Sequence, residues 1–474
     1  MQFGKALASH TTSIPGLLVI DLPVHGDDRG WFKENWQRQK MTAADIGLPD
    51  FAPVQNNISF NDEVGTTRGI HAEPWDKLVS VASGRIFGAW VDLREGESFG
   101  SVFSAEIDPS TAIFVPRGVG NSYQTLEADT AYSYLVNDHW AHDATYTFLN
   151  LADETVAIDW PIPLDRVPIS QKDRVHPRLA DVVPMPPKKI LVVGADGQLG
   201  RALEAEFGRH SWIEYAGRDA FDLSSDDMTS SRRWRDYTAI VNAAGFTDVD
   251  GAETHDGRAE AWATNVSALS ALARVAVTND LLLVHVSSDY VFDGRKPDAY
   301  TETDRLSPLG VYGQTKAAGE AVASVVPRHY ILRTSWLIGD GANFVKTMVH
   351  LAQTGAAPTV VDDQVGSLTF ARDLAKVVKE LLETRAPYGI YNFVGREGAK
   401  SWFGWAQDVF AALGHDPARV APIGTASYSK KHGGEIAPRP ANSILSTQKI
   451  EATLKGLTPT ASLADYLESI NSVR

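Results

Sequence analysis

The chain contains no cysteine, no apolar run long enough to cross a membrane and no excess of basic residues. The absence of cysteine excludes disulfides, thiolate metal sites and cysteine nucleophiles. A membrane-spanning helix needs about 20 consecutive apolar residues, and the sequence has no such stretch. The formal net charge is −15, which is not the basic footprint of a nucleic-acid binder. We therefore expect neither nucleic acid nor a membrane as a partner.

The first residues also lack a basic stretch followed by an apolar core, so we expect no signal peptide and a cytoplasmic protein. At 474 residues the chain is too long for one ordinary hydrophobic core. No internal repeat is visible. We therefore expect two domains that differ in their pattern of predicted strands and helices.

The N-terminal part, residues 1–183, consists of short β-rich runs such as KLVSVASG, RIFGAWVDL and AIFVPRG, separated by turn residues. This pattern is typical of an all-β barrel or jelly roll. Prolines 184, 186 and 187 follow, and they predict an extended linker over residues 184–189.

The C-terminal part, residues 190–474, alternates continuously apolar runs such as KILVVGA, TAIVNAAG and LLLVHVSS with helical segments. Apolar strands of this kind are buried on both faces of a parallel sheet. The alternation predicts a doubly wound α/β domain of the Rossmann type.

A glycine motif follows the first apolar run of this α/β part. Glycines there allow a tight turn and a close approach to a pyrophosphate, which the N-terminus of the next helix would bind. An ordinary strand-to-helix turn is the alternative, but the position between a strand and a helix favours a dinucleotide site. The motif residues are Gly194, Gly197, Gln198, Leu199 and Gly200. The choice between NADPH and NADH stays open, because Arg218 suits a 2′-phosphate and the acidic Asp219 and Asp222 oppose it.

Tyr312 and Lys316 lie one helical turn apart in a predicted helix, downstream of the strand that ends at Ser288. A nearby ammonium lowers the pKa of a phenol, and Tyr312 can then give a proton to a carbonyl oxygen as hydride reaches the carbon. Lys316 can also bind the nicotinamide ribose, and the Ser288 hydroxyl can bind the same carbonyl oxygen. Such a pair alone is common on solvated helices. Its place after the glycine motif favours catalysis.

The segments KILVVGADGQLG, LVHVSSDYVFDG and PLGVYGQTKAAGE resemble the dTDP-4-dehydrorhamnose reductase family, within the extended short-chain dehydrogenases. The resemblance spans residues 188–474. It implies hydride transfer from NADPH or NADH to the C4 ketone of a dTDP-linked 4-keto-6-deoxyhexose, with Ser288, Tyr312 and Lys316 as the catalytic residues. A non-catalytic subunit on the same scaffold is the alternative, and the retained Tyr/Lys pair argues against it.

The same resemblance implies further binding residues. The cofactor would also contact Asn242, Ala243 and Ala244, where Phe246 replaces the tyrosine of the family motif. The nucleotide-sugar would lie near Asn343, Arg439 and Asn442. Mg²⁺ is implied by the resemblance alone, because the sequence shows no ligand cluster for it.

In the β-rich part, TTRGIHAEPWDKLVSV, IFVPRGVGNSYQ and YSYLVNDHW resemble the dTDP-4-dehydrorhamnose 3,5-epimerase family, a jelly-roll cupin. The protons at C3 and C5 of the sugar are acidified by the C4 ketone, so a histidine can remove them. The resemblance makes His71 that base and Asp173 the carboxylate that orients it. Lys77 would stabilise the enolate, and Tyr134 would return a proton. Substrate binding is assigned to Arg29, Glu34, Gln55, Asn57 and Arg68.

Several motif positions differ from the epimerase family. Asn121 replaces a second histidine, and Trp140 replaces a tyrosine. These changes leave open whether C3, C5 or both are epimerised, and they also allow a ketoisomerase or a cupin that only binds the sugar. The final deoxysugar stays open too. We predict no metal in this domain, because its histidines are scattered in the sequence. The resemblance implies a homodimer formed through the cupin.

Overall fold

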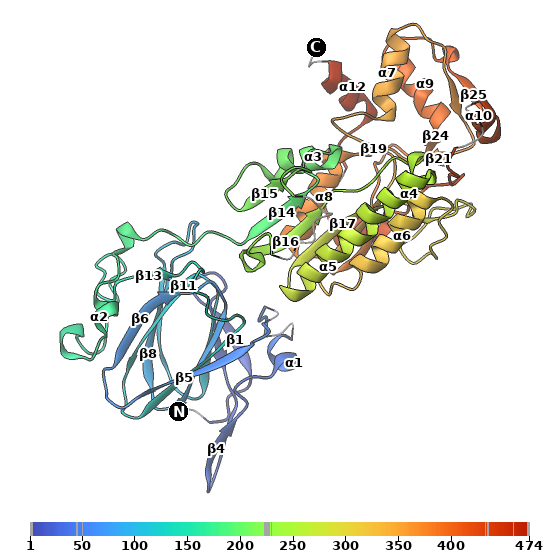
Figure 1. Cartoon of the computed structure of the whole chain (residues 1–474). Coiled ribbons are helices and arrows are strands. Elements are labelled where there is room, and N and C mark those ends of the chain that lie inside the picture. The colour runs from blue at the N-terminus through green and yellow to red at the C-terminus, as the bar shows by residue number, and fades with distance from the viewer. Residues whose placement is uncertain are drawn as a thin grey trace. The chain divides into compact units, whose positions relative to one another are not determined.

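The computed structural model describes residues 3–43, 46–49, 51–221, 228, 230–431, 433, 436–457 and 459–471. The chain forms two compact units, residues 1–187 and residues 188–474. No helix in the described part of the chain is long and apolar enough to cross a membrane. Each unit is described by itself below (Figure 1).

The N-terminal unit is built from two antiparallel sheets. The six-stranded sheet has the order β1 (Ala8–Thr11), β2 (Leu18–Asp21), β10 (Thr111–Val115), β7 (Lys77–Ser83), β12 (Thr130–Val136) and β5 (Gln55–Asn61). The five-stranded sheet has the order β13 (Thr147–Phe148), β6 (Thr67–Ala72), β11 (Val119–Thr125), β8 (Ile86–Asp92) and β9 (Val102–Ile107). Both sheets contribute to one apolar cluster, with Val79 and Ile113 from the first and Trp90 and Val119 from the second. The sheets therefore pack face to face.

Smaller elements border these sheets. The strands β3 (Val24–Asp27) and β4 (Gly30–Lys33) form a separate hairpin that extends away from them (Figure 1). The short helices α1 (Arg38–Met41) and α2 (Gln171–Arg174) lie in the connections. Ser170 caps α2, since its hydroxyl accepts the backbone N–H of Asp173 at 3.1 Å.

The strand register decides which residues of the N-terminal unit share its interior face. Tyr134 of β12 pairs with Val79 of β7 and with Asn57 of β5. Because side chains alternate along a strand, Lys77 projects from β7 on the same face as Val79. That face carries buried apolar residues, so the register holds the polar side chains of Lys77 and Tyr134 inside the unit.

The proline-rich segment 184–189 differs from the predicted linker. Met185 is a core residue of the N-terminal unit, and its backbone forms hydrogen bonds to Leu93 and Glu95. At the other end, Lys189 begins the first strand of the C-terminal unit. Burial of the Met185 side chain fixes the first part of the segment to the first unit, whereas Pro186 and Pro187 are exposed.

The C-terminal unit contains a six-stranded parallel sheet, as the apolar strands predicted. Its order is β15 (Ile213–Ala216), β14 (Lys189–Val193), β16 (Tyr237–Asn242), β17 (Leu282–Ser288), β18 (His329–Thr334) and β23 (Gly389–Asn392). The chain passes from β14 to one side and later returns to β16 on its other side. Ligands of doubly wound sheets bind at this kind of switch point, beyond the carboxyl ends of the strands.

Helices cover both faces of this sheet (Figure 1). Val192 of β14 faces the cluster that includes α3 (Gln198–Phe207), α8 (Ala371–Thr384) and α11 (Gln448–Thr453). Leu191 and Val193 face the opposite cluster, which α5 (Leu269–Thr278) and α6 (Val311–Ala323) join. The helix α4 (His255–Trp262) runs into α5 through a π-helical segment, Ala263–Ala268.

A smaller lobe follows the central strands. Its own core joins α7 (Phe344–Gln353), α9 (Trp402–Ala412) and α12 (Leu463–Asn471) around Trp405 and Phe410. The remaining elements are α10 (Thr425–Lys431) and the strand pairs β19 (Leu337–Ile338) with β22 (Thr369–Phe370), β20 (Thr359–Val361) with β25 (Ala421–Ile423), and β21 (Val365–Gly366) with β24 (Lys400–Ser401).

Candidate active sites

One cavity of the C-terminal unit joins the glycine motif to the predicted catalytic residues. Its volume is about 720 Å³, within the usual range for sites that bind small molecules. The lining includes Gly194, Gly197, Gln198, Leu199, Ala243, Ala244, Ser288, Tyr312 and Lys316. Residues more than a hundred positions apart in the sequence thus meet at the switch point of the sheet.

The glycine loop has no room for side chains. A Cβ on Gly200 would lie 2.2 Å from the carbonyl oxygen of Gly194, and one on Gly194 would lie 2.6 Å from the backbone nitrogen of Ala244. Gly194 also has a φ of +79°, which L side chains rarely adopt. The loop can therefore come close to a dinucleotide pyrophosphate at the N-terminus of α3, and it fits the predicted cofactor.

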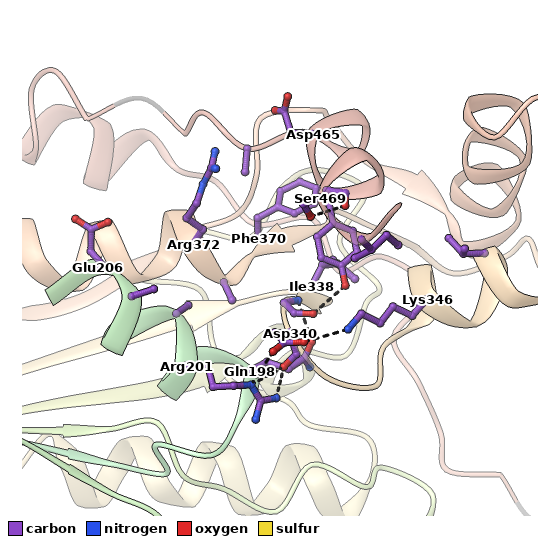
Figure 2. A pocket seen from close by; sticks show the side chains of 18 of the residues that line it. Gln198, Arg201, Glu206, Ile338, Asp340, Lys346, Phe370, Arg372, Asp465 and Ser469 are labelled. Atoms are coloured by element: carbon purple, nitrogen blue, oxygen red, sulfur yellow. Dashed lines mark hydrogen bonds and ion pairs between the residues drawn. The ribbon is translucent and has the colours of Figure 1, made fainter. Parts of the chain in front are cut away.

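Two of the residues predicted to bind the cofactor do not line the cavity and instead contact other parts of the protein. Gly200 packs against the loop backbone, and Asn242 is buried, with its amide near His285 and the backbone of Ala244. Gln198 lines the cavity, but its side-chain oxygen accepts the backbone N–H of Gly339 at 2.9 Å. Figure 2 shows Gln198 and Arg201 of α3 facing the loop that contains Asp340, in a neighbouring cavity. Gln198 thus ties the glycine loop to the smaller lobe.

Ser288, Tyr312 and Lys316 come together as predicted from their spacing, on β17 and α6. The ammonium group of Lys316 donates to the carbonyl of Val286 at 2.6 Å. The Ser288 hydroxyl donates to Asp289 at 2.8 Å and also acts on the Tyr312 phenol through a hydrogen bond. A substrate carbonyl beside this group would meet a phenol and a hydroxyl together.

The expectation that Lys316 lowers the pKa of Tyr312 is wrong for this structure. Burial raises the pKa of Tyr312 to about 12, and the charge of Asp289 acts in the same direction. Burial also lowers the pKa of Lys316 to about 8, against the effect of Glu320. Loss of hydration is the largest effect on both groups. Tyr312 is therefore protonated at neutral pH, which is the form that can donate a proton.

Asp289 was not singled out from the sequence. It is fully buried, it accepts hydrogen bonds from Ser288 and Ser335, and burial raises its pKa to about 6. The run Ser-Ser-Asp at a strand end was the available signal. Trp336 also lines the cavity and stacks on Trp402 with ring centroids 3.4 Å apart.

The predicted sugar residues Asn343, Arg439 and Asn442 do not line this cavity. Asn343 caps α7, where its side-chain oxygen accepts the backbone N–H of Lys346 at 3.0 Å. Arg439 forms an ion pair with Asp250 at 2.8 Å, and Asn442 donates to the backbone of Lys296 at 2.7 Å. All three support loops, and their role in binding the sugar stays a prediction.

Arg218 lines the cavity beyond β15, and its guanidinium lies 3.3 Å from Glu260. Its side chain is exposed, so a cofactor phosphate can reach it. Asp222, which opposed this interpretation in the sequence, lies outside the described residues.

In the N-terminal unit, His71 of β6 meets Asp173 of α2. Nε2 of His71 lies 2.9 Å from the Asp173 carboxylate, whose second oxygen faces the backbone N–H of Gly69 at 3.5 Å. Burial acts to raise the pKa of Asp173, but the hydrogen bond and charge of His71 outweigh it, so the pKa is lowered. An ionised carboxylate only accepts hydrogen bonds, so Nε2 carries the proton and Nδ1 is the basic nitrogen.

Lys77 and Tyr134, also predicted for the epimerase site, form a second group of the same unit. The Lys77 ammonium lies 5.8 Å from the centroid of the Tyr134 ring and forms an ion pair with Glu73, a residue not predicted from the sequence. Burial raises the pKa of Tyr134, and the charge of Glu73 adds to this effect. Tyr134 is thus a protonated phenol beside a buried cation.

Three of the predicted substrate residues border these groups. Arg68 donates to Asn61 at 3.1 Å and acts electrostatically on Tyr134. Gln55 donates to Asn57 at 2.8 Å, opposite Tyr134 in the sheet.

The other two predicted substrate residues lie apart from this group. Arg29 is at the tip of the β3–β4 hairpin, pairs with Asp27 and has a side chain that is 90% exposed. Glu34 pairs with Lys40. Their role stays a prediction.

Asn121, which replaces the second histidine of the family pattern, pairs with His71 in the sheet. Its side-chain oxygen accepts hydrogen bonds from Trp90 at 2.9 Å and from Tyr132 at 3.0 Å. Both donors are buried, so Asn121 joins the strand of His71 to the core of the unit. Trp140, the other departure, is exposed.

The fold also brings a second histidine to the His71–Asp173 pair. His176 is nearly as buried as Asp173, and its Nε2 lies 3.8 Å from the same carboxylate oxygen. The histidines are therefore scattered in sequence but not in space. Among the described residues, His71, Asp173 and His176 are the one group of at least three histidine, aspartate or glutamate side chains whose ligand atoms are close enough together to hold a metal. Its two imidazoles do not suit Mg²⁺, which prefers oxygen ligands.

These two sites define a class of protein. The N-terminal unit contains an oriented histidine, a buried lysine and a tyrosine, residue types that suit proton transfer next to a ketone. The C-terminal unit joins a dinucleotide loop to a tyrosine and a lysine, which suits hydride transfer to a ketone. The chain is a two-site enzyme of isomerase and oxidoreductase character.

Comparison with known proteins gives each half its family. Residues 188–471 match the family model described as RmlD substrate binding domain, and residues 11–181 match that of dTDP-4-dehydrorhamnose 3,5-epimerase. The chain belongs to both families, so it is a reductase fused to an epimerase.

Individual relatives agree with this division. A protein named RmlC homolog from Streptococcus pyogenes is 50% identical over 40% of this chain and 98% of its own length. The dTDP-4-dehydrorhamnose reductase of Mycobacterium tuberculosis is 37% identical over 57% of this chain and 88% of its own length. The crystal structure of the Bacillus anthracis reductase in complex with NADP is 30% identical, with a TM-score of 0.54 over 61% of this chain and all of that chain.

Proposed function

We propose that this chain carries out two consecutive steps of dTDP-L-rhamnose synthesis. The N-terminal unit epimerises dTDP-4-dehydro-6-deoxy-D-glucose at C3 and C5, and the C-terminal unit reduces the C4 ketone of the product with NADPH or NADH. The observation that carries this proposal is the presence of both catalytic groups, His71–Asp173 with Lys77 and Tyr134, and Ser288–Tyr312–Lys316, in one chain. The two antiparallel sheets of the N-terminal unit support its assignment as a jelly-roll cupin.

In the epimerase unit, Nδ1 of His71 removes a proton next to the ketone, and the ionised Asp173 stabilises the imidazolium that forms. The Lys77 ammonium stabilises the enolate oxygen, within a site that is buried from water. The protonated Tyr134 returns a proton to the carbon from the other face of the sugar, which inverts the centre.

In the reductase unit, the nicotinamide cofactor supplies the hydride. The glycine loop positions it, and Lys316, which lines the same cavity, binds its ribose. Ser288 and Tyr312 bind the carbonyl oxygen, and Tyr312 transfers its proton there as the carbon is reduced.

An NMR assay tests the proposed function. The purified chain is incubated with dTDP-4-dehydro-6-deoxy-D-glucose and NADPH without any added epimerase, and we expect dTDP-L-rhamnose to form. If NADPH is consumed only after a separate epimerase is added, the N-terminal unit is a binder or acts on another sugar. A product with one inverted centre would identify a monoepimerase.

We also propose that the chain is a homodimer through its N-terminal unit. Strand β5 is an edge of its sheet, and Ile58 and Phe60 in it and Val54 just before it have exposed side chains. Exposed apolar edge strands are sites for pairing with another chain. Ile58→Glu should convert a dimer to a monomer in light scattering, whereas Val175→Glu, at another exposed site, should not. A wild-type monomer would contradict the proposal.

A further inference from the structure

The His71–Asp173–His176 group has an arrangement that proton transfer alone does not explain. One carboxylate oxygen of Asp173 lies 2.9 Å from Nε2 of His71 and 3.8 Å from Nε2 of His176. The other oxygen faces the backbone N–H of Gly69, which holds the carboxylate in this orientation. Asp173 therefore presents one oxygen to two imidazoles.

The His176 ring is fixed but poorly satisfied. It stacks on Phe148 with centroids 4.9 Å apart and meets His71 edge-on at 5.3 Å. Its side chain is 6% exposed, and within the described part of the chain neither ring nitrogen makes a well-formed hydrogen bond. The ring also interacts with the backbone of Leu149 and, at 3.8 Å, with Asp173, but these contacts satisfy it poorly. Burying a poorly satisfied polar group is costly, so the arrangement indicates a ligand outside the protein.

The donor set suits a divalent transition metal. One ligand atom from each of the three residues lies within 4.8 Å of the others. Two ligands on one tetrahedral Zn²⁺, each at about 2.0–2.1 Å, lie roughly 3.3 Å apart, so small side-chain shifts would close the site. Two neutral imidazoles and one carboxylate leave a net negative charge for the cation. The His71 side chain is 35% exposed, which leaves it accessible to an ion from solvent.

We propose that His71, Asp173 and His176 form a binding site for a divalent transition-metal ion such as Zn²⁺, and that the bound ion switches off the epimerase unit. The inhibition, but not the binding, rests on the proposed function of His71. In the metal-free pair, Nε2 holds the proton and Nδ1 is the base. An ion on Nε2 leaves the neutral ring's one proton on Nδ1, which can then accept no proton from the sugar.

Metal binding is measured on the full chain after treatment with a chelator. Titration with Co²⁺ should give the visible absorption of one four-coordinate ion per chain, and Zn²⁺ should displace it. His176→Phe keeps a ring against Phe148 but removes the ligand, and His176→Gln is a second variant of different shape. Either should weaken Zn²⁺ binding at least about tenfold. His10→Gln, which removes an exposed histidine 2.9 Å from Asp21, should leave binding unchanged.

Inhibition is measured as deuterium exchange at C3 and C5 of the sugar in heavy water without NADPH. Saturating Zn²⁺ should suppress exchange at least tenfold and leave the reduction of a separately epimerised ketone unchanged. The half-inhibitory Zn²⁺ concentration should rise in the His176 variants by the same factor as the dissociation constant. Absence of Co²⁺ binding, equal binding by the His176 variants, or full exchange at saturating Zn²⁺ would each overturn the proposal. A metal-free chain without any exchange would overturn the proposed epimerase function, and Co²⁺ titration would still decide the metal site.

Discussion

Tyr312→Phe is expected to lower the rate of ketone reduction by about 10²–10⁴-fold, the usual contribution of a general acid. The phenol oxygen is the group that gives a proton to the carbonyl oxygen, and phenylalanine removes it while keeping the ring. Because burial raises the pKa of Tyr312 to about 12, the wild-type phenol is protonated at neutral pH and ready to donate. The rate is followed as NADPH oxidation, with a ketone that has been epimerised separately.

Two further measurements make this result specific. NADPH binding by Tyr312→Phe should change little, because the glycine loop is intact, and exchange at C3 and C5 should stay at the wild-type rate. Tyr388→Phe is the matched control, since it removes an exposed phenol that contacts Arg328 at 3.2 Å, outside the cavity. Reduction by Tyr312→Phe at the wild-type rate would show that another group donates the proton.

The sequence best predicts those parts of the reductase site whose geometry is determined by residues close together in the chain. The turn of Gly194, Gly197 and Gly200 and the helical spacing of Tyr312 and Lys316 are properties of a few neighbouring residues, and both occur where expected. The pKa of Tyr312 depends instead on how much protein surrounds it. Spacing predicts a nearby ammonium, but it does not show that both groups are buried and that burial dominates their pKa values.

Residues that meet across the fold were harder to predict. His176 lies beside His71 because the segment after β13, which includes α2, packs back against β6. No spacing motif in the sequence indicates this contact. The role of Glu73 follows from its ion pair with the buried Lys77, a contact that the sequence does not indicate. Conversely, Asn343 matched a family position but serves as a helix cap, a role that the backbone of α7 defines. Segment 184–189 is predicted as a linker from its prolines, and the burial of Met185 depends on contacts that the proline pattern does not indicate.

His71→Gln is expected to slow deuterium exchange at C3 and C5 by about 10²–10⁴-fold, because the glutamine amide cannot act as a base. The substitution keeps a polar side chain that can donate to Asp173, so the carboxylate need not be left unpaired. Exchange is measured by NMR in heavy water without NADPH, which separates proton removal from reduction. The reductase unit of the same variant, supplied with epimerised ketone, should work at the wild-type rate.

His10→Gln provides the matched control, since His10 also lies 2.9 Å from an aspartate, Asp21, but on the exposed strand β1. Its exchange rate should equal that of the wild type, because an exposed pair far from the lysine and tyrosine has no ketone to act on. Asp173→Asn should fall between the two: the base remains, but it loses the charge that stabilises its protonated form. Equal exchange in His71→Gln and the wild type would remove His71 as the base. Loss of exchange at one carbon alone would mean that His71 is the base for one centre and that a different group is the base for the other. That outcome would be informative because Asn121, which pairs with His71 in the sheet, replaces the second histidine of the family pattern.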